Sequence, residues 1–299
     1  MVRVFTSLTL LVLAACAGGD GDGGSTLSNT FTYTQTSSAG QALSGTPTLH
    51  PGGGATALSE ARNTGVTGVA VELRVNGDAT AEFLDLALAE NASGDTLTLS
   101  LDGGRIFDIA TLAAGSLADG DYTGVLYDDI TTSTTGLGTP EDFIFFSGFG
   151  TTGEFEVLFG AAGLQTPNAN LPALMTSYAG ELGLLVVNPT AQTVTFFEAD
   201  LLADADFANG QLTGGIQQNG GSVGSLTGQI TGAEVLGTLM ISNGVLDSGE
   251  TLTQGTLDAV GVFFGTGADN LAGVAAGQGV STTNGGQPEA LVGGFELSR

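Results

Sequence analysis

The chain has 299 residues, of which 31 are acidic and 5 are basic, so its formal charge is −26, and lysine is absent. Phosphate binding needs a cationic surface, so we expect no nucleic-acid partner for this acidic protein. Hydrophobic residues make up 41% of the chain, which is enough to bury a core, and the 50 glycines follow no three-residue period, which excludes a collagen-like chain.

Residues 1–15 have the pattern of a signal peptide. Arg3 supplies a positive charge, and the apolar run Val4–Leu13 is too short for a transmembrane helix, which needs about 20 residues. The segment Leu13-Ala14-Ala15-Cys16 resembles the bacterial lipobox. This resemblance implies cleavage before Cys16 and lipidation of its thiol, with acyl chains such as palmitate. An ordinary secretory signal with an incidental cysteine is the alternative.

Cys16 is the only cysteine, so the chain can form no internal disulfide, and a lipid anchor is the role that best accounts for the residue. Residues 16–26 read as a flexible Gly-rich tether, and a calcium-binding repeat at Asp20 and Asp22 is the alternative. Ala17, rather than aspartate, after the lipidated residue resembles outer-membrane lipoproteins of Gram-negative bacteria. We therefore expect a lipid-anchored outer-membrane protein at the cell surface, with the periplasmic face as the alternative.

Residues 27–165 predict an antiparallel β subdomain. Between Val69 and Val75 apolar and polar residues alternate, and Asn76-Gly77 follows directly, which predicts a strand and a tight hairpin turn. Further runs with strand character follow at 84–88, 97–101, 106–109, 143–146 and 154–159.

Residues 166–173, which include the motif TPNANLP, predict a linker and a domain boundary. Residues 174–299 predict an eight-stranded antiparallel β-barrel, because closure removes exposed strand edges. A β-sandwich is the alternative architecture, and a helix is the alternative for 197–207. The strand-like runs are 174–180, 182–187, 197–207, 211–216, 225–231, 235–242, 257–264, 271–276 and 290–297. Glycines within them predict bulges or tight curvature, at Gly214, Gly228, Gly237, Gly261, Gly273, Gly293 and Gly294.

Several motifs of the C-terminal half together resemble the β-barrel domain of transferrin-binding protein B-like surface lipoproteins. They are TPNANLP with Ser177-Tyr178-Ala179-Gly180, Gly261-Val262-Phe263-Phe264-Gly265 with Asn270-Leu271-Ala272-Gly273-Val274, and Val292-Gly293-Gly294-Phe295. Two positions depart from the family pattern, since Thr266 stands where proline is usual and Ala272-Gly273 replaces a glycine pair. The resemblance implies a handle-like subdomain before the barrel. It also implies a protein or haem ligand, such as an iron carrier, and a surface translocator as partners.

The sequence offers no strong catalytic or metal site. His50 is the only histidine and lies among loop-forming residues, so a Ser-His-Asp arrangement and a multi-histidine metal site are both disfavoured. Two carboxylate pairs are candidates for glycoside hydrolysis, Glu154 with Glu156 and Asp128 with Asp129, and only the first pair shares a strand face. We therefore expect no enzyme activity, no cofactor and no metal.

Tyr33, Tyr122, Tyr127 and Tyr178 are the only phenolic side chains that could coordinate haem iron or a ferric ion, and half-buried packing is the competing role. The acidic stripe Glu198–Asp206 is interpreted as the hydrated outer face of a strand, with a calcium site as the alternative.

The leading hypothesis is a non-enzymatic, lipid-anchored surface binding protein that captures an iron carrier, haem or another extracellular ligand through loop tips and exposed strand faces. The second hypothesis is a structural or adhesive envelope lipoprotein without a small-molecule ligand. A hydrolase that acts on glycans through Glu154 and Glu156 is the third.

Overall fold

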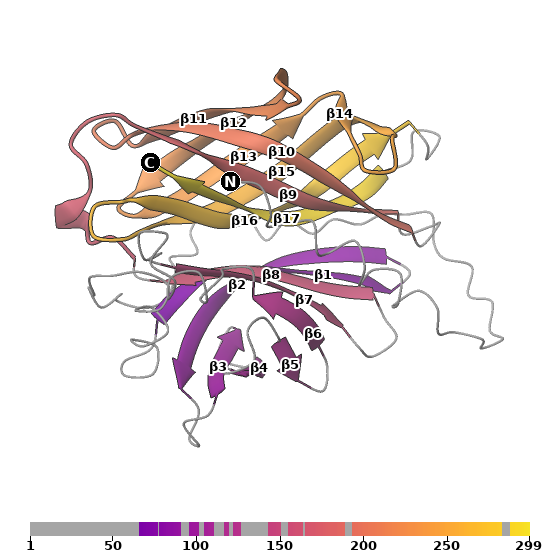
Figure 1. Cartoon of the computed structure of the whole chain (residues 1–299), viewed down its shortest axis with the longest axis horizontal. Coiled ribbons are helices and arrows are strands. Elements are labelled where there is room, and N and C mark those ends of the chain that lie inside the picture. The colour runs from indigo at the N-terminus through magenta and orange to yellow at the C-terminus, as the bar shows by residue number, and fades with distance from the viewer. Residues whose placement is uncertain are drawn as a thin grey trace.

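The protein, as a computed structural model, consists almost entirely of antiparallel strands (Figure 1). The structure describes residues 66–76, 78–90, 96–101, 105–110, 117–119, 122–126, 143–150, 155–163, 165–188, 193–282 and 288–299. In the N-terminal sheet, side chains are described at positions 68–75, 79, 81, 83 and 157–163. Within all of these ranges, no helix has the length and apolar character needed to cross a membrane.

The N-terminal sheet is a closed ring of strands β1–β8, which we call the N-terminal barrel. β1 pairs with β2 on one side and with β8 on the other, so the predicted handle-like subdomain is itself a closed sheet. The predicted hairpin is confirmed, because Asn76 at the end of β1 pairs with Asp78 at the start of β2. The strands are β1 (Val66–Asn76), β2 (Asp78–Glu90), β3 (Thr96–Leu101), β4 (Arg105–Ala110), β5 (Leu117–Asp119), β6 (Tyr122–Leu126), β7 (Phe143–Gly150) and β8 (Phe155–Gly163).

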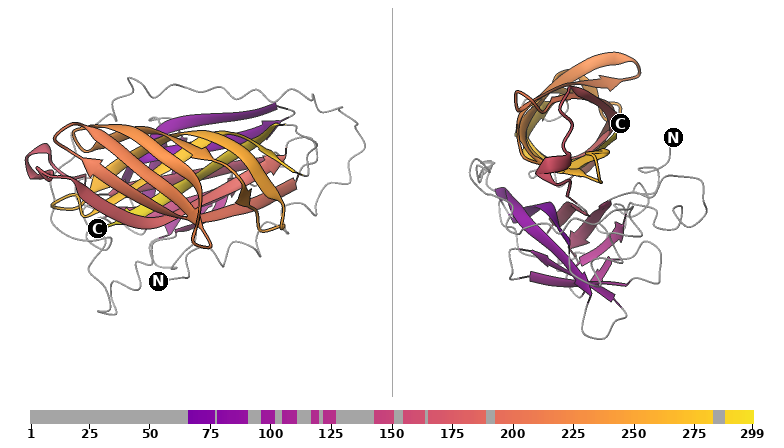
Figure 2. Two further views of the ribbon diagram at one scale, coloured as in Figure 1. Left: turned by 90° about the horizontal axis from the view of Figure 1, so that it is seen from above. Right: turned by 90° about the vertical axis from the view of Figure 1, so that its left-hand side faces the viewer.

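The C-terminal sheet has nine strands, and the pairing of β13 with β15 closes all of them except the short β14 into a barrel, which we call the C-terminal barrel (Figure 2). The predicted eight-stranded antiparallel barrel is therefore confirmed, and the sandwich alternative is wrong. The strands are β9 (Thr176–Asn188), β10 (Thr193–Asp206), β11 (Gln211–Gln218), β12 (Gly221–Thr231), β13 (Glu234–Ile241), β14 (Gly244–Val245), β15 (Thr251–Phe264), β16 (Asn270–Ser281) and β17 (Pro288–Ser298).

Two details of the predicted strands are corrected. The runs 174–180 and 182–187 are not separate strands, because residues 176–188 form the single strand β9. The run 197–207 belongs mainly to strand β10, which ends at Asp206, so the helical alternative is wrong.

Alternate residues of β10 face the inside and the outside of the C-terminal barrel. Phe197 and Leu201 are buried in the core, whereas Asp200 and Asp204 are exposed on the outer wall, as expected for a hydrated strand face. Leu202 also lies on the outer wall and is 40% exposed. The break in the apolar alternation is therefore an exposed leucine and not a change of structure.

Glycines in these strands allow close packing. Of the two predicted roles, bulges are wrong, since the register shifts lie elsewhere, at Ile216/Gln217 and Leu252/Gln254, whereas tight curvature stays a prediction. Gly261 and Gly273 are partners across β15 and β16. A Cβ added to them would lie 3.0 Å and 2.6 Å, respectively, from Cζ of Phe295. The two glycines thus make room for the ring of Phe295 inside the barrel.

The two barrels share one apolar cluster. β1, β2 and β8 contribute residues such as Val71, Phe83 and Phe159, which pack on the outer wall formed by β9 and β15–β17 (Figure 1). The second half of β9 is buried on both faces, because its inward residues fill one barrel and its outward residues contact the other. A strand buried on both faces reads as an unbroken apolar run, which is the pattern at 182–187.

Candidate functional site

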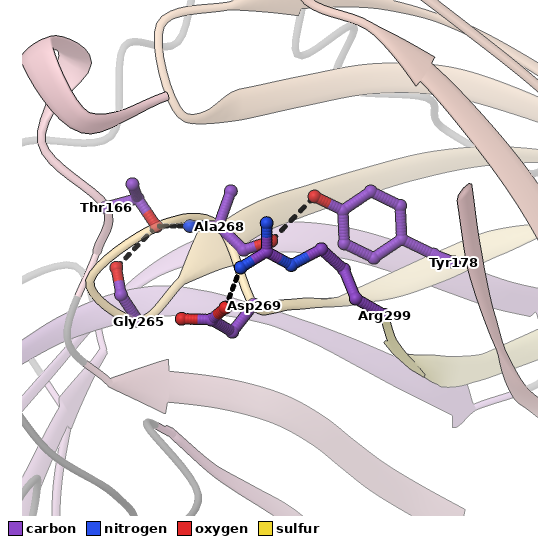
Figure 3. A network of polar contacts seen from close by, with 6 residues as sticks. All are labelled: Thr166, Tyr178, Gly265, Ala268, Asp269 and Arg299. Carbon is purple, nitrogen blue, oxygen red and sulfur yellow. Dashed lines mark hydrogen bonds and ion pairs between the residues drawn. The ribbon is translucent and has the colours of Figure 1, made fainter. Parts of the chain in front are cut away.

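The segment between β8 and β9 is fastened across one end of the C-terminal barrel. Thr166 is 1% exposed, and its hydroxyl donates to the Gly265 carbonyl at 2.7 Å and accepts from the Ala268 N–H at 3.2 Å (Figure 3). The Thr166 N–H donates to the Phe263 carbonyl at 2.8 Å. These bonds hold the segment against the turn between β15 and β16. We call residues 165–175 and 265–269 together the linker end.

Thr166→Val should loosen the linker end. Valine has a similar shape, but it has no hydroxyl, so the buried Ala268 N–H loses its partner. Leaving such a group unpaired costs about 1–3 kcal/mol. We expect a lower midpoint of urea unfolding and faster amide exchange at Ala268. Thr166→Ser keeps the hydroxyl and is the matched control, and equal stability of the two variants would contradict this role.

Tyr178 is a structural hydrogen-bond donor at the linker end. Tyr178 is 2% exposed. The centroid of its ring lies 5.5 Å from the ring centroid of Phe263, and the ring centroids of Phe263 and Phe207 lie 4.8 Å apart. Its hydroxyl donates to the Ala268 carbonyl at 2.6 Å. Burial raises the pKa of the Tyr178 phenol well above its usual value, although the Arg299 charge opposes this effect. A ligand to iron is a phenolate, so the geometry favours the packing role.

Large apolar side chains are exposed at the linker end. Leu174 is 78% exposed and Met175 is 63% exposed, directly before β9. The 3-10 helix η2 (Asn168–Asn170) lies earlier in the same segment. Exposed apolar residues beside polar groups are typical of protein-binding surfaces. This surface differs from the prediction of a strand at 174–180, because Leu174 and Met175 precede β9.

Charged groups lie at the same end of the barrel. Arg299 forms an ion pair with Asp269 (Figure 3). In the turn after β10, Asp206 accepts from the Asn209 backbone N–H at 3.1 Å and from its side-chain amide at 2.7 Å. These bonds lower the pKa of the Asp206 carboxyl. This end of the barrel therefore carries both an exposed apolar pair and charged side chains.

Three acidic residues lie side by side across the outer wall of the C-terminal barrel, and we call them the acidic strip. Glu181 on β9 pairs in register with Asp200 on β10 and with Glu296 on β17. Partial burial, followed by the Asp200 charge, raises the pKa of Glu181, and partial burial followed by Asp247 raises that of Glu198. In the part of the chain that the structure describes, no three His, Cys, Asp or Glu side chains are grouped to hold a metal ion. The strip would attract a cationic surface.

Most residues singled out from the sequence lie outside the described residues: Cys16, Tyr33, His50, Tyr127, Asp128, Asp129 and Glu154. Two others lie on strands of the N-terminal barrel. Tyr122 pairs with Gly150, and Glu156 pairs with Arg74. Arg74 forms an ion pair with the buried Glu72 at 2.8 Å. The hypothetical glycan site therefore depends on Glu154, whose position is not described.

Side chains fill the interior of the C-terminal barrel. Tyr178 and Phe263 occupy the core at the linker end, and Leu246, which is 2% exposed, closes the core at the opposite end. Small barrels of eight strands are commonly filled in this way. A partner is therefore expected to bind on the outside of this barrel.

Comparisons with known proteins support the fold. Neither a protein-family model nor a curated protein matches the sequence. Among solved structures, the chain is similar to a variant of transferrin-binding protein B from Haemophilus parasuis Hp5, with 17% identity and a TM-score of 0.51, over 77% of this chain and 45% of that chain. The isotype 1 protein from serogroup B Neisseria meningitidis is 15% identical with a TM-score of 0.46, over 77% and 43%.

The resemblance expected from the motifs is thus confirmed at the level of the fold. The chain spans less than half the length of these two transferrin-binding proteins. At this identity the similarity concerns the architecture, because one fold hosts many functions.

Proposed function

We propose that this protein is a non-enzymatic surface lipoprotein whose linker end captures an extracellular protein of the iron-carrier class. The observation that supports this function is the exposed pair Leu174 and Met175, on a segment that the buried Thr166 fastens to a filled barrel. A rigid scaffold that presents apolar side chains at its loop end suits protein recognition. The iron-carrier class follows by analogy with the similar transferrin-binding protein B.

The proposed location follows from the N-terminal sequence. A lipid on Cys16 would anchor the chain in the outer membrane, and the tether at 16–26 would hold the barrels away from the bilayer. A surface translocator would carry the anchored protein to the outside of the cell. Haem is the second ligand class in this proposal, and haem absorbance in the purified protein would identify it.

The double variant Leu174→Glu/Met175→Glu should abolish tight capture. Losing a central apolar anchor typically costs about 2 kcal/mol or more, so the affinity should fall by at least about 30-fold. Biolayer interferometry on the full chain in detergent micelles, with iron-loaded and iron-free transferrins and haem-carrying proteins as analytes, measures this change. Met240→Glu is the matched control, because Met240 is 56% exposed near the other end of the barrel. Equal weakening by the control would contradict the proposed surface.

The same exposed pair also favours self-association, the function of a structural or adhesive protein. Leu174 and Met175 could pack against a second copy of the chain rather than against a captured protein. Sedimentation velocity over a range of concentrations separates the two functions. Ligand-free oligomers that the double variant removes would favour the adhesive function.

A further inference from the structure

A plug closes the mouth of the C-terminal barrel opposite the linker end. We define the plug as residues 242–250, which include β14. Leu246 is buried in the barrel core, and its N–H donates to the Glu250 carbonyl at 2.8 Å. The Asp247 N–H donates to the Phe196 carbonyl at 3.0 Å. The plug is thus a short irregular segment, and local opening of such segments costs less than global unfolding.

Three buried polar residues, Asn188, Ser281 and Glu289, hold inward positions at this mouth of the barrel. On β17, Leu291 and Leu297 belong to the core, so the alternation directs Glu289 inward too. Ser281 holds the equivalent inward position at the end of β16, in the same alternation as Ala275. Glu289 is 5% exposed and Ser281 is 2% exposed.

Two of these side chains carry unpaired atoms. Oε2 of Glu289 and Oγ of Ser281 have no hydrogen-bond partner within the described ranges. Buried polar atoms without a partner are rare in folded proteins, because each costs free energy. The chain bears this cost twice at one mouth of the barrel.

The surroundings of Glu289 disfavour its negative charge. Burial raises the pKa of the Glu289 carboxyl, the nearby Ser281 hydroxyl and backbone N–H lower it, and the Glu250 charge raises it. Val187 on β9 pairs with Ala290 on β17. The next residue of β9, beside Glu289, is the neutral Asn188. Among the described residues, Glu250 of the plug is the one charged group that acts on Glu289. An ionised Glu289 is therefore buried and repelled by the plug.

We propose that Glu289 and Ser281 form a buried proton-binding site that locks the plug over the barrel mouth. The Ser281 hydroxyl can donate to a carboxylate or accept from the O–H of a neutral carboxyl, so it can pair with Glu289 in either protonation state. The proton acts by removing a buried negative charge that faces Glu250. Loss of the proton at higher pH restores the repulsion and opens the plug, while the remainder of the barrel stays folded.

The direction of the pH dependence follows from the sign of the shift. A carboxyl whose pKa is raised in the folded protein contributes its full stabilisation when the pH is below its ordinary pKa of 4.5. The protein loses this stabilisation as the pH rises through the pKa of the folded state. Amide protection in the plug should therefore fall with rising pH. The fall is about tenfold for each pH unit by which the folded pKa exceeds the ordinary value.

Hydrogen exchange on the full chain at about pH 5 and about pH 8, corrected for intrinsic exchange rates, tests the site through the amides of Leu246, Asp247 and Gly249. The wild type should be better protected at the lower pH. Glu289→Gln carries a donor and no charge, so its protection should be high and equal at both pH values. Glu250→Gln removes the repulsion and should reduce the difference between the two pH values.

Glu181→Gln is the matched control, because Glu181 also has a raised pKa but lies on the outer wall, outside the plug. In Glu181→Gln, the amide protection of the plug should change with pH as it does in the wild type. A wild-type pH response in Glu289→Gln, or protection that rises with pH, overturns the proposal. Restoration of protection by Na⁺, K⁺ or Ca²⁺ at the higher pH also overturns it, because it would identify a cation site. Should Glu289→Gln fail to fold, an unchanged pH response in Glu250→Gln overturns the proposal.

Discussion

Cys16→Ala should move the protein from the membrane fraction to the soluble fraction. The variant has no thiol to accept a diacylglycerol, and Cys16 is the only cysteine in the chain. Each buried methylene of an acyl chain contributes about 0.8 kcal/mol to membrane attachment, so several chains hold a protein firmly. Without these chains, release of the variant from the membrane should be nearly complete. Immunoblotting of membranes washed with high salt and carbonate measures the distribution.

Mass spectrometry of the N-terminal peptide gives an independent check of the anchor. The mature wild type should begin at Cys16 and carry the mass of the attached lipid. Ser25→Ala changes only the tether and should leave the protein in washed membranes. Persistence of Cys16→Ala in those membranes, or an unmodified mature N-terminus in the wild type, would refute the lipid anchor.

Phe263→Ala should destabilise the C-terminal barrel by about 3–5 kcal/mol, the usual cost of removing a buried aromatic ring. Phe263 is 0% exposed, and its ring packs between Tyr178 and Phe207. The loss is large compared with the total stability of a domain, which is about 5–15 kcal/mol. Chemical denaturation followed by tyrosine fluorescence and circular dichroism measures it.

Two comparison variants make this result specific. Phe263→Leu retains much of the side-chain volume and should cost less than about 2 kcal/mol. Met240→Ala removes a side chain that is 56% exposed and should change the stability by no more than about 0.5 kcal/mol. A Phe263→Ala loss no larger than that of Met240→Ala would show that this ring does not pack in the core.

The C-terminal barrel was predictable because its strands alternate regularly and tight turns separate them. Asn209-Gly210 ends the hairpin between β10 and β11, where Gly210 has a φ of +65° that suits glycine. The closure of the N-terminal barrel was not predictable. It depends on the pairing of β1 with β8, whose partners Val71 and Phe159 lie far apart in the sequence, and local alternation carries no information about such a pair.

The surface features were harder to predict than the strands. Leu174 and Met175 have the composition of a strand, but they lie before β9, in a segment that Thr166 fastens to the distant turn at 265–268, and such a long-range contact cannot be read from local alternation. Glu289 could have been found from the sequence. It extends the alternation of Leu291, Gly293 and Phe295 toward the start of β17, which places a carboxyl on the inward face.

The most direct test of surface capture is binding of a labelled iron-carrier protein to intact cells that produce either the wild type or Leu174→Glu/Met175→Glu. Protease sensitivity on the same cells establishes that equal amounts of the two proteins are displayed. We predict saturable binding to the wild-type cells and none above background to the cells with the double variant. Wild-type cells that display the protein but bind no carrier, or equal binding to both kinds of cell, would contradict capture at the linker end.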